Sequence, residues 1–305
     1  MTPLLSQPNL GTLSGLSAAG FHRVSYTDWG DPENPHLVIC VHGLTRNGRD
    51  FDWLARRLSQ DARVICPDIV GRGNSEWLGD ASLYSYPQYL ADMNALIARV
   101  TAGHARAGRV PIIDWVGTSM GGLIGMMLAA TPGTPLRRLV MNDVGPVLAK
   151  EGLTLIGTYA GTDPRFDTVE AFSAWFATLH RPWGAGTDSL PEDRLQHLVE
   201  HGIRRFTDPA GRITYGLRYD PAIAAGFRGK VFDRDIEMWP VWSQVAAPVL
   251  ILRGAASNLF RADTARQMIQ RNPATSLIEF EGIGHAPALA SDDQIEPIAR
   301  FLFTP

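Results

Sequence analysis

A serine with glycine two residues to either side constrains the fold of this chain more than any other sequence feature. Residues 117–121 read GTSMG; an apolar run at 112–116 precedes them and an apolar run at 122–130 follows. A G-x-S-x-G segment between a buried strand and a helix is typical of a nucleophile elbow. The sharp turn exposes the serine hydroxyl above the sheet and leaves room only for small flanking residues. The pattern therefore predicts that Ser119 is a nucleophile.

Short apolar runs alternate with helical patterns over much of the chain. The runs have the composition of buried parallel strands and lie at 37–41, 64–66, 112–116, 139–141 and 249–252. Segments with helical character lie at 50–59, 86–100 and 123–130. Such alternation predicts an α/β fold, with a mostly parallel central sheet flanked by helices.

This alternation stops after Asp143. No buried-strand pattern is evident between about 145 and 243, where 169–179 and 192–203 have the spacing of amphipathic helices. We therefore expect a core of residues 1–144 and 244–305 and an inserted helical cap of residues 145–243. Aromatic residues of the cap, Trp183 among them, are candidates for lining a substrate pocket.

Charge and length narrow the class of partner. The chain has 305 residues, a net charge of −3 and no block of lysine or arginine, which argues against a nucleic-acid or polybasic membrane surface. No apolar stretch is long enough to span a bilayer, and the N-terminus lacks a charged leader before an apolar segment. We expect a cytoplasmic protein that acts on a small molecule; its oligomeric state stays open.

Two further motifs supply partners for the serine. His285 follows an apolar stretch near the C-terminus, and the elbow-type triad runs in the order serine, acid, histidine, so His285 is the candidate base. The segment HGLT at 42–45 follows the strand predicted at 37–41, which suggests that the backbone amides of Leu44 and Met120 form an oxyanion hole. We interpret His42 as structural because it precedes the turn.

Together these motifs carry a family resemblance. They read HGLT at 42–45, DIVGRGNS at 68–75, GTSMGG at 117–122, LRGAASNLF near 253–260 and GIGHAP at 282–287. The chain resembles the α/β-hydrolase superfamily, and more narrowly cap-bearing bacterial enzymes such as 3-oxoadipate enol-lactonases and meta-cleavage-product hydrolases. The resemblance implies the α/β-hydrolase fold, ester-like chemistry and no metal or organic cofactor. It also implies structural roles for Asp68, Arg72 and Ser75.

The catalytic acid is where the chain departs from the family pattern. Relatives carry aspartate after the strand predicted at 249–252, and this chain has Asn258 there. An amide can orient a histidine but cannot stabilise its positive charge; the equivalent change in a serine protease costs roughly 10⁴ in turnover. Asp143, at the end of the preceding strand, is the alternative acid. We favour an altered acid position at Asn258 over an acid relocated to Asp143.

The predicted function is a serine hydrolase that cleaves a small carboxylic ester or lactone through an acyl-enzyme and is slowed by Asn258. One alternative is hydrolysis of a carbon–carbon bond in a meta-cleavage-type diketone. The candidates for binding a substrate carboxylate are then Arg46, Arg72 and cap arginines such as Arg165, Arg181 and Arg218. The other alternative is a non-catalytic ligand-binding member of the fold, which only Asn258 suggests.

Overall fold

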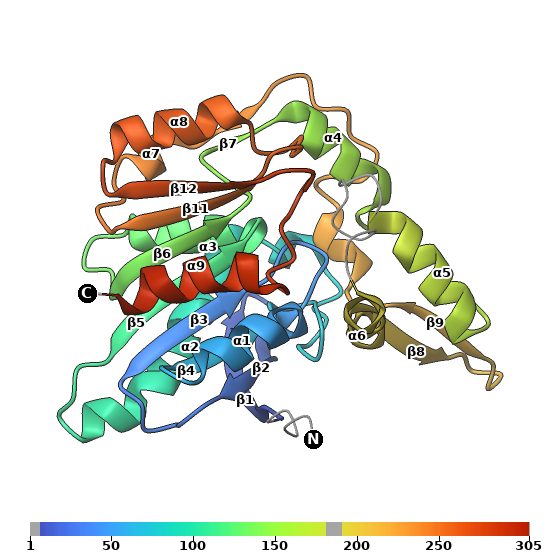
Figure 1. Cartoon of the computed structure of the whole chain (residues 1–305). Helices are drawn as coiled ribbons and strands as arrows, with labels where there is room; N and C mark the ends of the chain where they lie inside the picture. Colours follow the sequence, from blue (N-terminus) through green and yellow to red (C-terminus); the bar gives the residue numbers. More distant parts are fainter. Residues whose placement is uncertain (1–6, 181–190, 305) are drawn as a thin grey trace.

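An eight-stranded sheet forms the centre of the molecule (Figure 1). The computed structural model describes residues 7–180 and 191–304. In spatial order the strands are β1 (Asn9–Ser17), β2 (Gly20–Trp29), β4 (Arg63–Pro67), β3 (His36–Val41), β5 (Ile112–Thr118), β6 (Leu136–Asn142), β11 (Val249–Gly254) and β12 (Thr275–Phe280). The pairs from β4 to β12 are parallel, whereas β1–β2 and β2–β4 are antiparallel.

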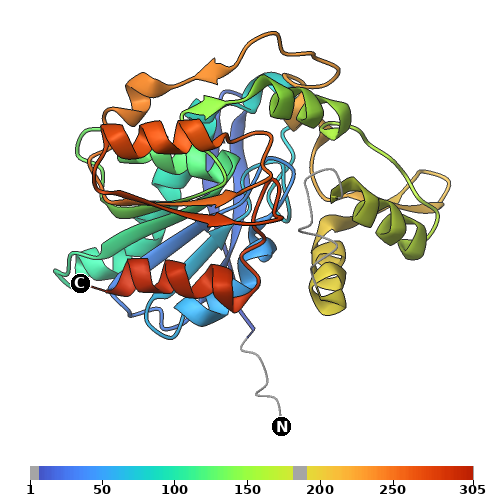
Figure 2. The same cartoon turned by 45° about the horizontal axis from the view of Figure 1, so that its top comes forward.

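Helices cover both faces of this sheet (Figures 1 and 2). One face packs against α2 (Tyr86–Arg106), α3 (Met120–Ala129), α7 (Trp239–Trp242) and α8 (Ala262–Arg271). The opposite face packs against α1 (Asp52–Leu58), which follows the short 3₁₀ helix η1 (Gly48–Phe51), and against α9 (Asp292–Phe303).

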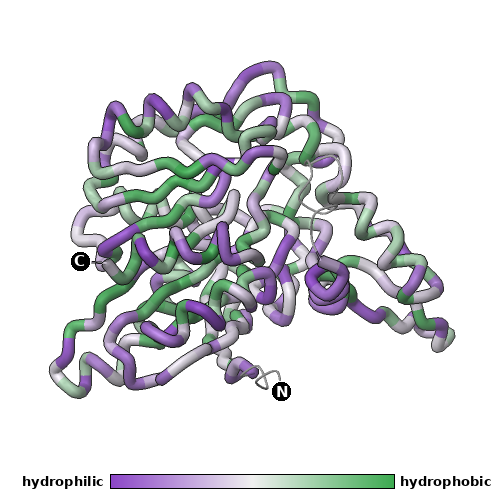
Figure 3. Tube along the Cα trace, in the orientation of Figure 1, coloured by the Kyte–Doolittle hydropathy of each residue, from purple (hydrophilic) through white to green (hydrophobic). Residues whose placement is uncertain are grey.

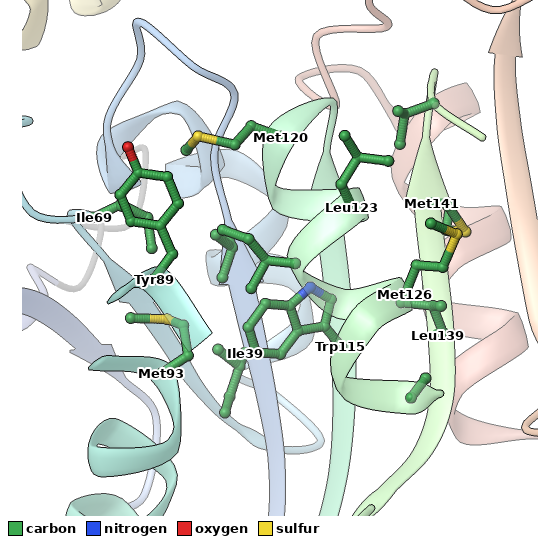
Figure 4. Close-up of a cluster of buried hydrophobic side chains, with 14 of the residues drawn as sticks. Ile39, Ile69, Tyr89, Met93, Trp115, Met120, Leu123, Met126, Leu139 and Met141 are labelled. Atoms are coloured by element: carbon green, nitrogen blue, oxygen red, sulfur yellow. The ribbon is translucent and has the colours of Figure 1, made fainter. Parts of the chain in front are cut away.

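Side chains that alternate along the strands fill two apolar layers, one on each face of the sheet. In β3, Ile39 and Val41 pack into the layer of α2 and α3, whereas Val38 and Cys40 pack into the layer of α1 and α9. Because side chains point to opposite faces at successive positions, a continuous apolar run is needed to bury both faces. Figure 4 shows part of the first layer, where Trp115 lies between Ile39 and Met126. Figure 3 shows the same contrast in hydropathy, with hydrophobic residues along the central strands.

The five predicted buried strands and the helical segments between them are confirmed as β3, β4, β5, β6 and β11 and as α1, α2 and α3. The hairpin β1–β2 was not predicted. Its outer strand β1 lies at the edge of the sheet and is largely exposed, so it lacks the apolar run that identifies a buried strand.

An inserted, largely helical region joins β6 to β11, as the sequence predicts. It comprises β7 (Val147–Leu148), α4 (Lys150–Tyr159), α5 (Val169–His180), α6 (Glu192–Gly202), β8 (Ile203–Thr207), β9 (Ile213–Leu217), the 3₁₀ helix η4 (Pro221–Ala224) and β10 (Ile236–Glu237), and α7 follows it. Figures 1 and 2 both show α5, α6, β8 and β9 grouped beside one end of the sheet. The β8–β9 hairpin was not predicted, because its short strands are half-exposed. The domain boundaries at 144 and 244 stay a prediction.

Among the described residues, no helix combines the length and the apolar character needed to span a bilayer.

Candidate active site

Ser119 sits in a strained turn between β5 and α3. Its φ is 52° and its ψ is −116°, a conformation that side-chain-bearing residues rarely adopt. A Cβ atom added at Gly121 would lie 1.9 Å from the carbonyl oxygen of Val41, and one at Gly117 would lie 2.3 Å from the backbone of Gly121. The glycines are therefore required because backbone segments touch at these positions, as the elbow pattern predicts.

Ser119, His285 and Asp143 form one hydrogen-bonded chain. The Oγ atom of Ser119 lies 2.9 Å from Nε2 of His285, and Nδ1 of His285 lies 2.7 Å from Oδ2 of Asp143. A carboxylate only accepts hydrogen bonds, so Nδ1 carries the proton and Nε2 accepts from the serine hydroxyl. This is the arrangement in which a histidine can remove the serine proton.

The partner of His285 corrects the preference for Asn258. Asp143, at the carboxyl end of β6, faces Nδ1 of His285. Asn258 is half-buried, and its Oδ1 atom accepts no hydrogen bond from any residue that the structure describes. Since β6 and β11 are neighbouring parallel strands, their carboxyl ends lie at the same edge of the sheet, and an acid from β6 reaches His285 as well as one from β11.

Asp143 is fully buried, and three donors hold its carboxylate. Gly254 N–H donates to Oδ1 at 2.8 Å, while the Ser257 hydroxyl donates to Oδ2 at 2.6 Å beside His285. These bonds fix the orientation of the carboxylate, and a buried charge needs such partners. Sequence reasoning missed Ser257, although it stands next to the position where the family carries its acid.

Asn142 is a second residue that the motifs did not single out. Its Nδ2 donates to Thr118 Oγ1 at 3.0 Å and to the carbonyl oxygen of Pro287 at 2.8 Å. The side chain thus connects the end of β5 to the loop that carries His285. It stabilises the relative position of nucleophile and base.

The predicted oxyanion donors lie beside the nucleophile. Leu44 and Ser119 line the same two pockets, and Met120 is the first residue of α3. Among the described residues, neither the Leu44 amide nor the Met120 amide donates to a recorded acceptor, whereas Ser119 N–H donates to Asn142 O at 2.9 Å. Two unoccupied amides next to a nucleophile are able to stabilise an oxyanion.

Arg72 holds the loop that carries Leu44. The guanidinium is completely buried, and Nε donates to the Leu44 carbonyl at 2.9 Å. Nη1 donates to Val70 O at 2.8 Å and to the hydroxyl oxygen of Tyr89 at 3.0 Å, while Nη2 lies 3.5 Å from Met120 Sδ. The structural role predicted for Arg72 is therefore confirmed, and it acts on the site itself.

His42 and Asp68 are also structural. His42 Nδ1 lies 2.7 Å from Gly43 O, and its Nε2 accepts from Ile69 N–H at 3.0 Å. Burial lowers the pKa of His42 to about 4. Asp68 accepts from Gly48 N–H at 2.8 Å and Asn74 N–H at 2.7 Å, and burial raises its pKa to about 6.

Two pockets open beside Ser119. The first, here called the His285 pocket, has a volume of about 170 Å³ and is lined by Gly43, Leu44, Thr45, Arg46, Asp50, Phe51, Thr118, Ser119, Ile156, Tyr159, Phe176, Leu179, Leu198, Leu217, Tyr219 and residues 285–288. The second, here called the elbow pocket, has a volume of about 110 Å³ and is lined by Leu44, Tyr84, Ser85, Tyr86, Tyr89, Ser119, Met120, Leu123, Val144, Leu148, Leu153, Ile156, Ile223, Phe227 and Leu259. Both are smaller than the roughly 300–1,000 Å³ of sites for drug-sized ligands, so small substrates fit best.

Arg46 lines the His285 pocket, and its guanidinium is paired. Its Nε donates to Asp50 Oδ2 at 2.8 Å and its Nη2 donates to Asp50 Oδ1 at 2.7 Å. A role for Arg46 toward a substrate carboxylate stays a prediction. Trp183, the other predicted pocket residue, lies outside the described residues.

One cluster has the composition of a metal site. Ligand atoms of Asp52, His197 and His201 lie within 4.8 Å of one another, where α6 meets the start of α1. However, Arg49 donates to both carboxylate oxygens of Asp52, and His197 Nε2 lies 3.0 Å from the Arg49 carbonyl. These partners explain the cluster as a contact between the inserted region and the core.

Comparisons with known proteins agree with this geometry. Residues 38–299 match the model of the alpha/beta hydrolase family. A 3-hydroxybutyrate-oligomer hydrolase from Cupriavidus necator is 41% identical over 97% of this chain and 98% of its own length. A pimeloyl-(acyl-carrier protein) methyl ester esterase from Aliivibrio fischeri is 25% identical over 87% of this chain and 93% of its own.

A solved structure extends the similarity to three dimensions. An alpha/beta hydrolase from Novosphingobium aromaticivorans superposes with a TM-score of 0.77 at 32% identity, covering 97% of this chain and 99% of that one. The chain is an enzyme homologous to ester hydrolases, and it belongs to the alpha/beta hydrolase family.

Proposed function

We propose that this chain is a serine esterase that cleaves small carboxylic esters through an acyl-enzyme. The observation that carries the proposal is the continuous hydrogen-bond chain from Ser119 Oγ through His285 to Asp143. Such a chain activates a hydroxyl that is otherwise a weak nucleophile.

Acylation proceeds by attack of Ser119 Oγ on the ester carbonyl carbon. The serine proton moves to His285 Nε2, and the carbonyl oxygen takes the negative charge beside the amides of Leu44 and Met120. The carbon–oxygen bond to the alcohol then breaks, and the leaving oxygen receives the proton from His285. Asp143 stabilises the imidazolium during both transfers.

Deacylation repeats these steps with water. His285 takes a proton from the water, the hydroxyl oxygen attacks the acyl carbon, and the bond to Ser119 Oγ breaks as the proton returns to the serine. The net reaction consumes one ester and one water and releases one acid and one alcohol.

The substrate we propose is a short hydroxyacyl ester, in particular a small 3-hydroxybutyrate oligomer. The 41% identity to a 3-hydroxybutyrate-oligomer hydrolase supports this class, and so do the small volumes of the two pockets. Hydrolysis of lactones stays a prediction. Carbon–carbon hydrolysis has weaker support, because Arg46 is already paired with Asp50.

A covalent probe tests the nucleophile. A fluorophosphonate should label the enzyme once, at Ser119, and Ser119→Ala should abolish labelling and reduce ester hydrolysis by roughly 10⁵-fold or more. Ser243→Ala, at the exposed serine that follows α7, is the matched control and should keep both. Labelling or hydrolysis that survives in Ser119→Ala would contradict the proposal.

Substrate series then separate the reaction classes. Dimers and trimers of 3-hydroxybutyrate, a γ-lactone and a ring-cleavage dienoate should be assayed side by side with the same enzyme. We expect release of 3-hydroxybutyrate and no turnover of the dienoate. If the enzyme turned over the dienoate and none of the esters, carbon–carbon hydrolysis would replace ester hydrolysis as the proposed function.

A further inference from the structure

The two pockets meet at the nucleophile from different sides. Leu44 and Ser119 line both, while residues 285–288 line only the His285 pocket and Met120 lines only the elbow pocket. An ester whose carbonyl carbon lies at Ser119 can therefore extend one half into each pocket. The proton transfers of the proposed reaction decide which pocket takes the alcohol half of the ester and which takes the acyl half.

Proton transfer assigns the alcohol half. In the proposed reaction His285 gives its proton to the leaving oxygen, so that oxygen must lie within hydrogen-bond reach of Nε2. The leaving alcohol then extends into the pocket lined by residues 285–288. The acyl chain is left with the elbow pocket, on the side of the Met120 amide.

Most of the elbow pocket suits a short carbon chain. Leu123, Val144, Leu148 and Leu153 contribute apolar side chains, and Phe227 is half-buried at its boundary. In Figure 4, Met120 and Leu123 extend from the first turns of α3 within the same apolar cluster as Tyr89. Since the volume is only about 110 Å³, a short acyl chain fits better than a long one.

Tyr89 adds one directed polar group. Its side chain is 4% exposed, and its oxygen accepts a hydrogen bond of 3.0 Å from Arg72 Nη1. A guanidinium has no acceptor, so the tyrosine hydrogen takes no part in that bond. Within residues 7–180 and 191–304, no acceptor is recorded for this hydrogen.

The position of this hydroxyl is fixed by Arg72. The same guanidinium is bound to the Leu44 carbonyl and lies 3.5 Å from Met120 Sδ, which sets the Tyr89 oxygen beside the residues that carry the oxyanion amides. Figure 4 shows the Tyr89 hydroxyl on the same side of the cluster as the Met120 sulfur. A buried donor without an acceptor is unfavourable, so a ligand oxygen at this point gains a hydrogen bond.

We propose that the elbow pocket is the acyl pocket and that Tyr89 donates a hydrogen bond to a hydroxyl oxygen on a short acyl chain. The inference rests on the proposed esterase function and deepens it. It makes Tyr89 a residue that selects 3-hydroxyacyl esters over plain acyl esters of the same length. The Arg72–Tyr89 bond holds the donor in place before the substrate arrives.

A pair of substrates tests the role of Tyr89. Ethyl 3-hydroxybutyrate and ethyl butyrate share the alcohol and the chain length, and acid release from both can be followed in a pH-stat. The wild type should have the higher kcat/KM for the hydroxy ester. Tyr89→Phe should reduce that preference roughly 3- to 10-fold, mainly by lowering kcat/KM for the hydroxy ester.

Tyr215→Phe is the matched control because Tyr215, a half-buried tyrosine on β9, lines neither pocket, and this variant should keep the wild-type preference. Thermal unfolding of each variant shows whether the fold is intact. An unchanged preference in folded Tyr89→Phe would overturn the inference. That result is also expected if the Tyr89 hydroxyl donates to a water molecule and never to the substrate.

A second variant tests the acyl assignment without Tyr89. Phe227→Ala enlarges the elbow pocket, so kcat/KM for ethyl hexanoate should rise severalfold relative to ethyl butyrate, while the ranking of butyrate esters of different alcohols stays the same. A change in the alcohol ranking alone would overturn the assignment. If ester hydrolysis survives in Ser119→Ala, the proposed function itself has failed; loss of activity there with an unchanged Tyr89→Phe preference rejects only this inference.

Discussion

Asp143 has two oxygens and three donors, and this geometry sets its chemistry. His285, Ser257 and the Gly254 amide all donate to it in a fully buried environment. The negative charge is therefore compensated by fixed dipoles and stays available to stabilise the imidazolium. The amide at Asn258 has no such task, so it does not weaken the proposed triad.

The role of Asn258 can be checked by restoring the aspartate that relatives carry. We expect Asn258→Asp to change kcat/KM for a short ester by less than about threefold, because Nδ1 of His285 already has a carboxylate partner. Steady-state kinetics of the two proteins measure this. A gain of a hundredfold or more would mean that Asn258, and not Asp143, limits the enzyme.

His42 makes stability depend on pH. Burial lowers its pKa to about 4, below the ordinary value near 6.5, so the folded state favours neutral imidazole. This contribution is complete above about pH 6.5 and is lost as the pH falls toward 4. The contribution of His42 to the free energy of unfolding is about 3 kcal/mol.

The test is the free energy of unfolding in urea, measured between pH 7 and 4. His42→Gln should flatten the loss of stability on acidification. Asp68, whose pKa is raised to about 6, acts in the opposite direction over the same range, and it is present in both proteins. Parallel curves for wild type and variant would contradict the assignment to His42.

Sequence patterns identified Ser119 and His285 because their motifs are local. The acid was ambiguous, since β6 and β11 both end at the edge where His285 lies, and only their actual geometry decides between them. Tyr89 was not singled out at all. Its importance depends on Arg72, which is adjacent in space but 17 residues away in sequence.

At the scale of elements, the elbow works because α3 packs directly onto the ends of β3 and β5. Trp115 Nε1 donates to Gly121 O at 2.9 Å, and Gly121 touches the Val41 carbonyl. This close packing positions the Met120 amide, the first of α3, beside Ser119. The close packing also leaves no space for a side chain at position 121.

Two glycine-to-alanine substitutions compare the effects of close packing and of helix propensity on the free energy of unfolding. Gly121→Ala should destabilise the protein by roughly 3 kcal/mol or more, since its Cβ would lie 1.9 Å from Val41 O. Gly103→Ala, in α2 with nothing within 4 Å of the added Cβ, should stabilise by about 0.5–1 kcal/mol. Urea unfolding measures both. Equal effects in the two variants would mean that close packing at the elbow is not what requires glycine.

Buried parallel strands could be predicted from sequence because they need apolar residues on both faces, as in β3 and β11. The β8–β9 hairpin could not, because partial exposure removes that signal. The same physical property, burial, decides which elements a sequence reveals.

At the scale of the whole molecule, the inserted region supplies residues to both pockets beside Ser119 and contacts the core through polar and apolar side chains. Among the polar contacts, Asn47 Nδ2 donates to His201 O at 2.9 Å, Tyr84 Oη donates to Asp220 Oδ2 at 2.6 Å, and the backbones of Arg72 and Tyr219 pair in an antiparallel sense. The strands of its hairpin are half-exposed, while β3 and β11 are almost entirely buried.

This difference predicts unequal local stability. Amides of α5, α6 and the β8–β9 hairpin should exchange with deuterium at least tenfold faster than those of β3, β5 and β11, because fewer buried contacts oppose their opening. Hydrogen exchange followed by mass spectrometry measures the ratio. Equal protection in both regions would show that the inserted region and the core open as one unit.

The central claim is that Asp143 completes the triad with Ser119 and His285. Its most direct test is kcat for a short ester in Asp143→Asn, a change that keeps the shape of the side chain and removes its charge. The account predicts a loss of roughly 10⁴-fold, with the fold retained and the rate of fluorophosphonate labelling at Ser119 reduced together with turnover. A kcat within tenfold of the wild type would contradict it.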